Sequence, residues 1–392
     1  MKRKILLVTL MFLAVALAAA QARPAMAQAA QSNQNASVLC TPGVYLSDPG
    51  DCLPLGPSTY LTSMGEKGFT FPARPLLASK PDPSLTLIPY SYAVLHDSAA
   101  LYRSLDEARS GGAPARVMNS FGIKFISYVD LAYAEGKEKP SFYQLKSGEW
   151  TADVASRWSG VLSFQGLEFS DTPQQTFGWI NAINSVIETK RTPGYQNDYT
   201  GLFRYQYEVV QVYDVQEGGG MEWYLVGPDE WIEGRFIGRV YPNATPPEGV
   251  TNGRWIEINL HEQTLSVYDQ SRLVYATLIA SGSDPFWTRP GLFPIYKMQE
   301  STPMSGTFEI DGSDFYYLED VPWTLYYDEA RAIHGAYWRP RLGFPQSHGC
   351  VNMAPGDSQW VFNWANEGDW VYVWDPSGET PVDPELYSPG GA

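Results

Sequence analysis

The stretch "FPQSHGCVNM" places a cysteine, Cys350, two residues after His348 and 16 residues after His334. Attack on a carbonyl carbon needs a thiolate. A free thiol with a pKa of about 8.5 is mostly protonated at neutral pH unless a base or a positive charge assists it. The chain has four histidines, and the other two, His96 and His261, are interpreted as structural because they lie in an upstream repeat and at a strand turn. The spacing therefore indicates a cysteine nucleophile with a histidine base.

The beginning of the chain predicts export. Residues 1–27 contain a basic start, an apolar run and an Ala-Met-Ala sequence, which is typical of a signal peptide cleaved after Ala27. The apolar run has 16 residues, fewer than the roughly 20 that a membrane span needs. An uncleaved anchor helix is the alternative. In both cases the protein is expected outside the cytoplasm, in the cell envelope.

The cysteines are few for an exported protein. Cys40 and Cys52 lie 12 residues apart in a turn-rich stretch, and we predict a local disulfide between them. That pairing leaves Cys350 without a partner in the chain. An unpaired thiol in an oxidising compartment is a liability unless chemistry requires it.

Two other interpretations of Cys350 compete with a catalytic role. It could be a buried structural cysteine, although histidines are scarce in this chain and two of them lie nearby. It could also bind zinc together with His334 and His348, but no fourth cysteine or CxxC pair supports such a site. We therefore expect neither a metal nor a cofactor.

The charge of the chain argues against nucleic acid as a partner. Removal of residues 1–27 takes away four basic and no acidic residues, so that the net charge of −16 becomes −20. So acidic a chain repels phosphate backbones and anionic membranes.

The first half of the chain predicts β structure after a leader. Short β-branched and aromatic runs, broken by turn residues, indicate a mainly β protein. Residues 28–88 are predicted to form a Pro-rich leader stapled by the disulfide. The segments "FYQLKSGEW" and "WYLVGPDEW" lie 81 residues apart and share an aromatic pair, a turn and Glu-Trp, which predicts two hairpins. They suggest two small SH3-like β-barrel repeats, residues 89–165 and 166–242, which either bind the cell wall or serve as packing units.

The last part of the chain has the sharpest pattern. After a Pro-rich linker, residues 243–253, alternating apolar residues predict an antiparallel meander. The sequence "PGDSQWVFNWANEG" predicts a short amphipathic helix with Asp357 as its N-cap, and "WVYVW" predicts a closing strand. Residues 254–376 are expected to form one domain, followed by a tail, residues 377–392.

The sequence "IHGAYWRPRLGFPQSHGCVNM" resembles the signature of the L,D-transpeptidase catalytic domain, also called YkuD: His-Gly, a spacer, then Ser/Thr-His-Gly-Cys, a small apolar residue and Asn or Arg. The resemblance extends over roughly residues 254–374. It implies a β-sandwich catalytic domain with a short helix.

The resemblance also implies roles for the site. It assigns the general base to the earlier histidine, His334, and the orientation of its imidazole to the backbone carbonyl of Gly335. His348 would then support the local hydrogen-bond network, although a strand would place it on the same face as Cys350. Gly349 lacks a Cβ, so its backbone can turn sharply and direct its N–H, with that of Cys350, toward a developing oxyanion.

Four neighbouring residues are predicted to bind substrate or support the loop. Ser347 and Asn352 are expected to fix the loop around the cysteine, with a direct substrate contact as the alternative. Tyr337 and Trp338 are expected either to wall the cleft or to belong to the core.

The resemblance implies a peptidoglycan substrate. The enzyme would cleave the bond between a diamino acid and the terminal D-Ala of a tetrapeptide stem, form a thioester and transfer the acyl group to an amine of another stem, giving a 3→3 cross-link. Carbapenem-type β-lactams would be covalent inhibitors. An L,D-carboxypeptidase that uses water, and an inactive wall-binding protein, remain the alternatives. Papain-like endopeptidases are disfavoured because their cysteine precedes the histidine.

Overall fold

The computed structural model describes residues 76–118, 122–152, 155–182, 186–196, 198–227, 229–307 and 315–387. The predicted signal peptide, most of the leader and the predicted Cys40–Cys52 disulfide lie outside these residues. The described part of the chain is mainly β, as the sequence predicted. It contains no helix with the length and apolar character of a membrane crossing.

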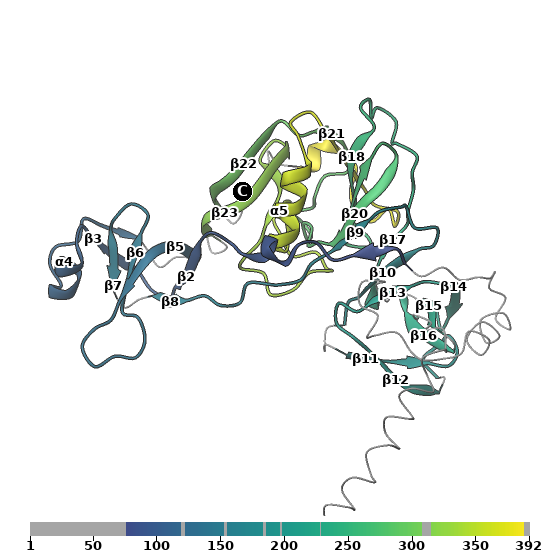
Figure 1. Cartoon of the computed structure of the whole chain (residues 1–392), viewed down its shortest axis with the longest axis horizontal. Helices are drawn as coiled ribbons and strands as arrows, with labels where there is room; N and C mark the ends of the chain where they lie inside the picture. Colours follow the sequence, from purple (N-terminus) through teal and green to yellow (C-terminus); the bar gives the residue numbers. More distant parts are fainter. Residues whose placement is uncertain are drawn as a thin grey trace, which may run out of the picture. The chain divides into compact units, whose positions relative to one another are not determined.

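One sheet of the C-terminal domain contains the predicted meander. The strands β18 (Arg254–Asn259), β19 (Thr264–Asp269) and β20 (Arg272–Leu278) pair antiparallel in succession. The closing strand β26 (Trp370–Trp374) pairs parallel with β18 and antiparallel with β21 (Gly291–Pro294). Its alternate residues Val371 and Val373 are buried in the core. The labels β18, β20 and β21 in Figure 1 mark this sheet.

A second sheet faces the first across the core. It contains β22 (Lys297–Gly306), β23 (Tyr316–Asp328), β24 (Arg331–Gly335) and β25 (Val351–Met353). The helix α5 (Pro355–Trp364) packs against β23 and β24. Apolar side chains from both sheets and from α5, among them Ile258, Leu325 and Val361, form one buried cluster. The arrangement is the β-sandwich with a short helix that the resemblance implied.

The first predicted repeat is joined to this second sheet. Its elements are β2 (Ser91–Leu95), β3 (Ala99–Tyr102), α4 (Leu105–Ser110), β4 (Arg116–Met118), β5 (Ile123–Ala132), β6 (Phe142–Leu145), β7 (Trp150–Ala152) and β8 (Ala155–Arg157). The predicted hairpin is present as the antiparallel pair β6–β7. The strand β5 pairs parallel with β23, so that the described strands form an open sheet continuous with the second sheet and not the closed barrel that the sequence predicted.

The second predicted repeat also forms open sheets in the described part. One has three strands, β13 (Val209–Gln211), β10 (Phe177–Ile180) and β17 (Ile237–Val240). The other has five, β12 (Tyr199–Tyr205), β11 (Val186–Lys190), β16 (Glu230–Glu233), β15 (Met221–Gly227) and β14 (Asp214–Gly218). The second predicted hairpin is the antiparallel pair β15–β16.

The segment at the expected start of this repeat belongs to another sheet. The strand β9 (Leu167–Phe169) pairs antiparallel with β20 of the meander and with β1 (Ala78–Ser79) of the leader. Chain segments upstream of residue 254 therefore extend the meander sheet.

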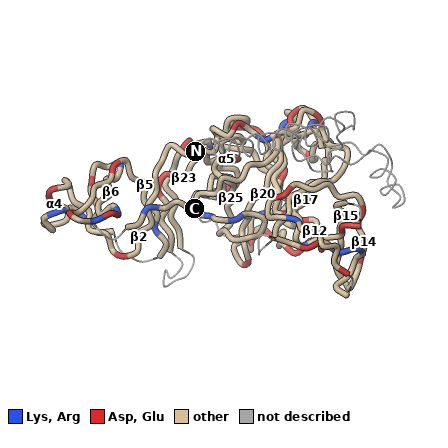
Figure 2. Tube along the Cα trace, turned by 60° about the horizontal axis from the view of Figure 1, so that its bottom comes forward, with Lys and Arg blue, Asp and Glu red and all other residues tan. Residues whose placement is uncertain are grey.

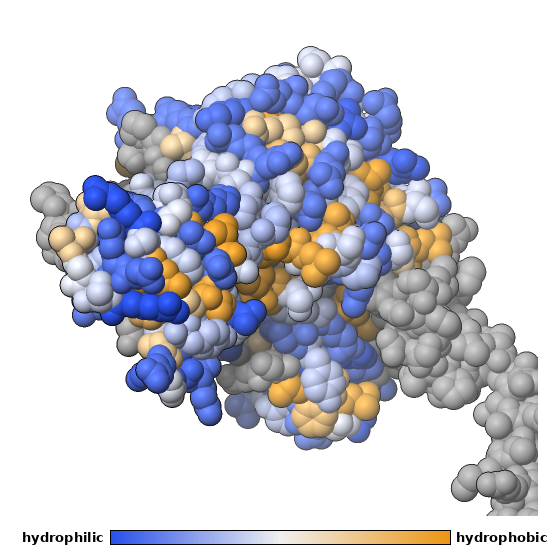
Figure 3. Space-filling model, turned by 60° about the vertical axis from the view of Figure 1, so that its left-hand side comes forward, coloured by the Kyte–Doolittle hydropathy of each residue, from blue (hydrophilic) through white to orange (hydrophobic). Residues whose placement is uncertain are grey.

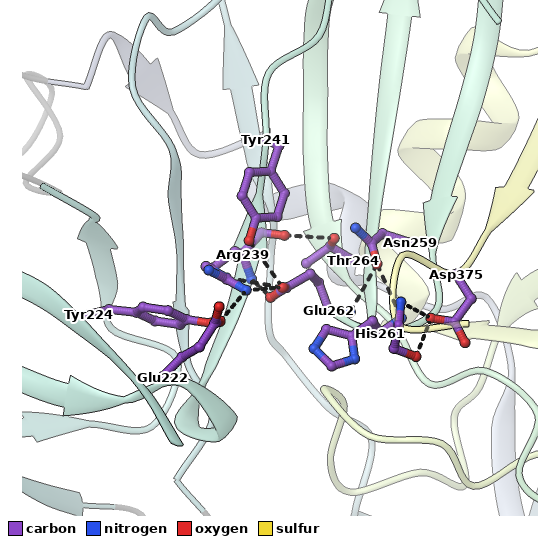
Figure 4. Close-up of polar contacts among 10 residues, drawn as sticks. Glu222, Tyr224, Arg239, Tyr241, Asn259, His261, Glu262, Thr264 and Asp375 are labelled. Carbon is purple, nitrogen blue, oxygen red and sulfur yellow. Dashed lines mark hydrogen bonds and ion pairs between the residues drawn. The ribbon is translucent and has the colours of Figure 1, made fainter. Parts of the chain in front are cut away.

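A buried ion pair links β17 to the turn between β18 and β19 (Figure 4). The guanidinium of Arg239 donates to Oε1 of Glu262 from Nε at 3.0 Å and from Nη2 at 2.7 Å. Tyr241 donates to the same oxygen at 3.3 Å, and the hydroxyl of Thr264 donates to the carbonyl of Arg239 at 3.0 Å. This network holds β17 beside the meander, and hydrogen bonds between charged partners of this kind are stronger than those between neutral groups.

The described residues carry charges of both signs, and both polar and apolar residues reach the surface. Lys and Arg are scattered among Asp and Glu along the trace (Figure 2). Apolar residues reach the surface in separate patches between polar ones on the face shown in Figure 3.

Candidate active site

Cys350 lies in a small cleft of the C-terminal domain, with a volume of about 110 Å³. Six of the residues singled out from the sequence line it together: His334, Trp338, Ser347, His348, Cys350 and Asn352. The remaining lining residues are Ile123, Met304, Tyr316, Leu318 and Arg339. A larger cavity of about 1010 Å³ lies around the second repeat, but its lining holds neither a cysteine nor a histidine, so the small cleft is the candidate catalytic site.

The parallel pairing of β24 and β25 positions the imidazole of His334 and the thiol of Cys350. His334 is the register partner of Asn352, and Ile333 is the partner of Val351. Cys350 directly precedes β25 and is 5% exposed, with its Sγ 3.8 Å from the carbonyl oxygen of Ala330. Two adjacent strands thus bring the thiol and the imidazole to one cleft.

Burial determines the protonation states of the Cys350 thiol and the His334 imidazole. Desolvation raises the pKa of the Cys350 thiol to about 11, against the smaller opposing effects of a backbone hydrogen bond from Ala332 and the positive charge of Arg331. Desolvation lowers the pKa of His334 to about 4, although its hydrogen bond to Gly335 opposes the change. At neutral pH the resting site therefore holds a neutral thiol and a neutral imidazole, and not a preformed thiolate–imidazolium pair.

The imidazole of His334 is held on two sides. Its Nδ1 lies 3.4 Å from the carbonyl oxygen of Gly335, and its ring stacks on Trp338 with the centroids 5.6 Å apart. A neutral imidazole that donates from Nδ1 leaves Nε2 as the proton acceptor. Gly335 itself lies where a Cβ would come within 2.6 Å of Ser358 Oγ and 3.0 Å of Pro322 Cγ, so this backbone has no room for a side chain.

Ser347 and Gly349 shape the loop that carries the cysteine. Gly349 has a φ of +116°, a conformation that favours glycine. Its N–H donates to Ser347 Oγ at 3.2 Å, and that hydroxyl donates to the carbonyl of Cys350 at 2.5 Å. The expected role of the Gly349 N–H as an oxyanion donor therefore does not fit this structure, because its hydrogen is already used within the loop.

The backbone N–H of Cys350, unlike that of Gly349, makes no hydrogen bond to a described residue. The register of the β24–β25 pair begins at Val351, one residue after Cys350. This N–H remains the available donor for an oxyanion. Asn352 fixes the other end of the loop, since its Nδ2 donates to the carbonyl of Ala280 at 3.2 Å.

His348 lies between aromatic rings at the edge of the cleft. Its ring is stacked on Tyr316 with centroids 5.5 Å apart and tilted against Phe286 at 5.1 Å. These contacts favour a packing role for His348 and leave His334 as the more buried imidazole.

The adjacent aromatic residues Tyr337 and Trp338 point to different places. Trp338 lines the cleft. Tyr337 is fully buried, stacks on Tyr92 at 3.4 Å and donates to the carbonyl of Glu319 at 2.7 Å. Of the two, Trp338 alone can contact substrate, while Tyr337 belongs to the core that joins β2 and β23.

The sequence predicted Asp357 as the N-cap of α5, and this prediction is wrong. The helix begins at Pro355 with Ala354 as its N-cap, so Asp357 lies within the first turn and is fully buried. Its carboxylate accepts from the Gly166 N–H at 2.9 Å, from the Tyr275 hydroxyl at 2.7 Å and from the hydroxyl of Thr277. Burial raises the pKa of Asp357 to about 6.

Arg339 is the charged residue among the described cleft residues that the sequence did not single out. Arg339 follows Trp338, lines the cleft beside His334 and helps to lower the pKa of that histidine. The zinc alternative finds no support in the described residues, which contain no group of three or more His, Cys, Asp or Glu side chains able to hold a metal ion.

Comparison with protein families agrees with this geometry. Residues 253–373 match the model of the L,D-transpeptidase catalytic domain, YkuD. By this match, residues 253–373 are similar to the YkuD catalytic domain. The match covers the meander, β21 to β25, α5 and the segment that carries His334 and Cys350.

Several solved L,D-transpeptidases are similar to the chain. A mutant of the Enterococcus faecium enzyme is 24% identical, with 31% of this chain and 50% of that chain covered and a TM-score of 0.29. The ertapenem-acylated catalytic domain from E. faecium is 27% identical, covering 32% and 100% of the two chains, with a TM-score of 0.29. The enzyme from Mycobacterium smegmatis is 18% identical, covering 54% and 90%, with a TM-score of 0.30. The match spans half the length of the first of these, and no curated protein sequence matches the chain.

Proposed function

We propose that this protein is a peptidoglycan L,D-transpeptidase in which Cys350 is the nucleophile and His334 the general base. The supporting observation is that a free thiol and a buried imidazole line one cleft of an L,D-transpeptidase domain. The substrates proposed are tetrapeptide stems, as donor and as acceptor.

In the acylation step, Nε2 of His334 takes the proton of the Cys350 thiol as Sγ attacks the carbonyl carbon of the diamino acid residue. The carbonyl oxygen becomes an oxyanion, to which the Cys350 N–H can donate. As the intermediate collapses, the bond from carbon to the amide nitrogen of D-Ala breaks. The imidazolium returns the proton to that nitrogen, and free D-Ala leaves a thioester on Sγ.

In the transfer step, the amine of an acceptor stem attacks the thioester carbon. His334 removes a proton from the attacking nitrogen and returns it to Sγ as the carbon–sulfur bond breaks. The product is a 3→3 cross-link, and the enzyme recovers its thiol. No oxidant, nucleotide or metal takes part in this balance.

The neutral resting state fits this scheme. Because the pKa of the thiol is raised to about 11 and that of the imidazole is lowered to about 4, proton transfer is unfavourable until a carbonyl group is present to accept the sulfur. A thiol of this kind is also protected from oxidation in an extracytoplasmic compartment, because the thiolate is the species that reacts. We propose this compartment, the cell envelope, as the location of the protein.

Incubation with purified tetrapeptide stems, followed by mass spectrometry of the products, tests the proposal. Cross-linked dimers with loss of D-Ala support transpeptidation, whereas tripeptides alone indicate that water is the acceptor. His334→Ala should lower kcat by about 10²- to 10⁴-fold. His261→Ala, a histidine outside the cleft, is the matched control and should leave kcat unchanged. Unchanged substrate with the wild-type protein contradicts the proposal.

Covalent inhibition offers a second test of the nucleophile. A carbapenem presents a strained carbonyl to the same thiol, so a stable adduct is expected on Cys350 and absent from Cys350→Ala.

A further inference from the structure

Among its described lining residues, the cleft around Cys350 contains one permanent cation and no carboxylate. Arg339 is the only Lys or Arg among its lining residues, and none of them is Asp or Glu. In a chain whose acidic residues outnumber its basic ones by 43 to 27, a cleft of this kind selects an anion.

Arg339 differs from other arginines of the described chain that are withdrawn from solvent. Arg331 and Arg239 each lie within 3.0 Å of a carboxylate oxygen, from Asp328 and Glu262 respectively. Arg339 instead donates to the backbone carbonyl and, at 3.5 Å, to the side-chain oxygen of Gln346, both neutral groups. Its Nε is buried and has no acceptor.

This state is unfavourable for the enzyme without substrate. Removing a guanidinium from water without a counter-ion costs free energy, and here burial lowers the pKa of Arg339 without any compensating carboxylate. An anion that enters the cleft would supply the missing partner and would gain a charge-assisted hydrogen bond.

The position of Arg339 beside His334 indicates which anion this is. In the proposed reaction the imidazole must return a proton to the nitrogen of the departing D-Ala. The carboxylate of that residue is separated from the nitrogen by a single carbon, Cα. A cation next to the imidazole is therefore within reach of the terminal carboxylate of the donor stem and of no other group so directly tied to the reacting atoms.

We infer that Arg339 binds the free carboxylate of the residue that leaves, and so restricts the donor to stems that end one residue after the cleaved bond. This inference rests on the proposed transpeptidase function. A stem with one more residue would place a neutral amide against the guanidinium, and it would be a poor donor because the buried charge would stay unpaired.

The test compares a tetrapeptide stem with the same peptide carrying a C-terminal carboxamide. For the wild-type enzyme, kcat/KM should be roughly 10- to 100-fold higher with the free acid. Arg339→Gln should abolish this preference by lowering kcat/KM for the acid alone. Arg339→Lys, which keeps the charge, should retain part of it. The control is Arg341→Gln, an exposed arginine two residues further on that does not line this cleft.

A binding measurement separates this inference from the proposed chemistry. In a Cys350→Ala background, calorimetric titration should show tighter binding of the acid than of the carboxamide, and adding Arg339→Gln should remove the difference. An equal preference with and without Arg339 overturns the inference, even if wild-type turnover is normal. Absence of turnover in the wild type, with the Arg339-dependent preference intact, overturns the proposed reaction and not the carboxylate site.

Discussion

His334 lies opposite Asn352 in the parallel pair β24–β25, which sets the imidazole two residues along the partner strand from Cys350. The pairing fixes His334, the proposed base, relative to Val351, the residue that follows the loop carrying Cys350. A site on paired strands is more rigid than one on loops, which suits a reaction that needs both groups in one orientation.

The neutral resting thiol predicts an unusual pH dependence of alkylation. Iodoacetamide reacts with the thiolate, so its rate with Cys350 should rise about tenfold per pH unit between about pH 7 and 10. Because the pKa of the thiol is about 11, no plateau is expected in this range. His334→Ala should give the same slope. A rate that is already constant near neutral pH would show a thiolate–imidazolium pair and contradict this account.

Substitution of Gly335 tests how tightly the base is held. In Gly335→Ala the new Cβ meets Ser358 and the ring of Pro322, so β24 must shift and carry His334 with it. We expect a loss of about 1–3 kcal/mol in unfolding free energy together with a lower acylation rate. In the control Gly112→Ala, the nearest atom lies 3.7 Å from the new Cβ, and both quantities should stay near the wild-type values. If Gly335→Ala is acylated at the same rate as the wild-type protein, the claim that packing around Gly335 positions His334 is contradicted.

The two neighbouring aromatic residues should separate stability from catalysis. Tyr337→Phe removes the hydrogen bond to the Glu319 carbonyl and should lower the unfolding free energy by about 1 kcal/mol without changing KM. Trp338→Leu removes the ring that stacks on His334 and should reduce kcat/KM. Thermal or denaturant unfolding and steady-state kinetics on both variants are the measurement. The opposite pattern would place Tyr337 in the cleft.

Asp357 should act through stability. Asp357→Ala leaves the donors of Gly166, Tyr275 and Thr277 without their acceptor and should cost on the order of 3 kcal/mol of unfolding free energy. Asp106→Ala, an exposed carboxylate in α4, is the control, with an expected change below about 1 kcal/mol.

The raised pKa of Asp357 gives the same variant a second readout. Since that pKa is about 6 in the folded chain and 3.8 in the reference state, the folded chain binds the proton more tightly. The wild-type protein should therefore lose stability from this group as the pH rises from 3.8 to 6. Asp357→Ala should lack this pH-dependent loss of stability. If the variant and the wild type show the same dependence of unfolding free energy on pH, the raised pKa of Asp357 is contradicted.

The sequence predicted what depends on local pattern. The alternation of apolar residues was sufficient for the meander β18–β20, and the aromatic pairs flanking turn residues were sufficient for the hairpins β6–β7 and β15–β16. The scarcity of histidine, together with the family signature, singled out Cys350 and His334, which the fold brings to one cleft.

What the sequence did not predict depends on contacts between distant segments. The pairing of β5 with β23 joins strands almost 200 residues apart, and no local periodicity encodes it. Tyr337 and Trp338 are adjacent and similar in type, and the core around Tyr92 decides which of them reaches the cleft. Arg339 carries no distinguishing pattern in the sequence. Its significance arises because none of the described residues that line the cleft with it is Asp or Glu.

Intact-protein mass spectrometry after brief mixing with a tetrapeptide stem tests the central claim most directly. The wild-type protein should gain the mass of the stem less its terminal D-Ala, with the adduct mapped to Cys350. His334→Ala should form it far more slowly, and Cys350→Ala should not form it. An adduct on another residue, or release of D-Ala by Cys350→Ala, would contradict the account.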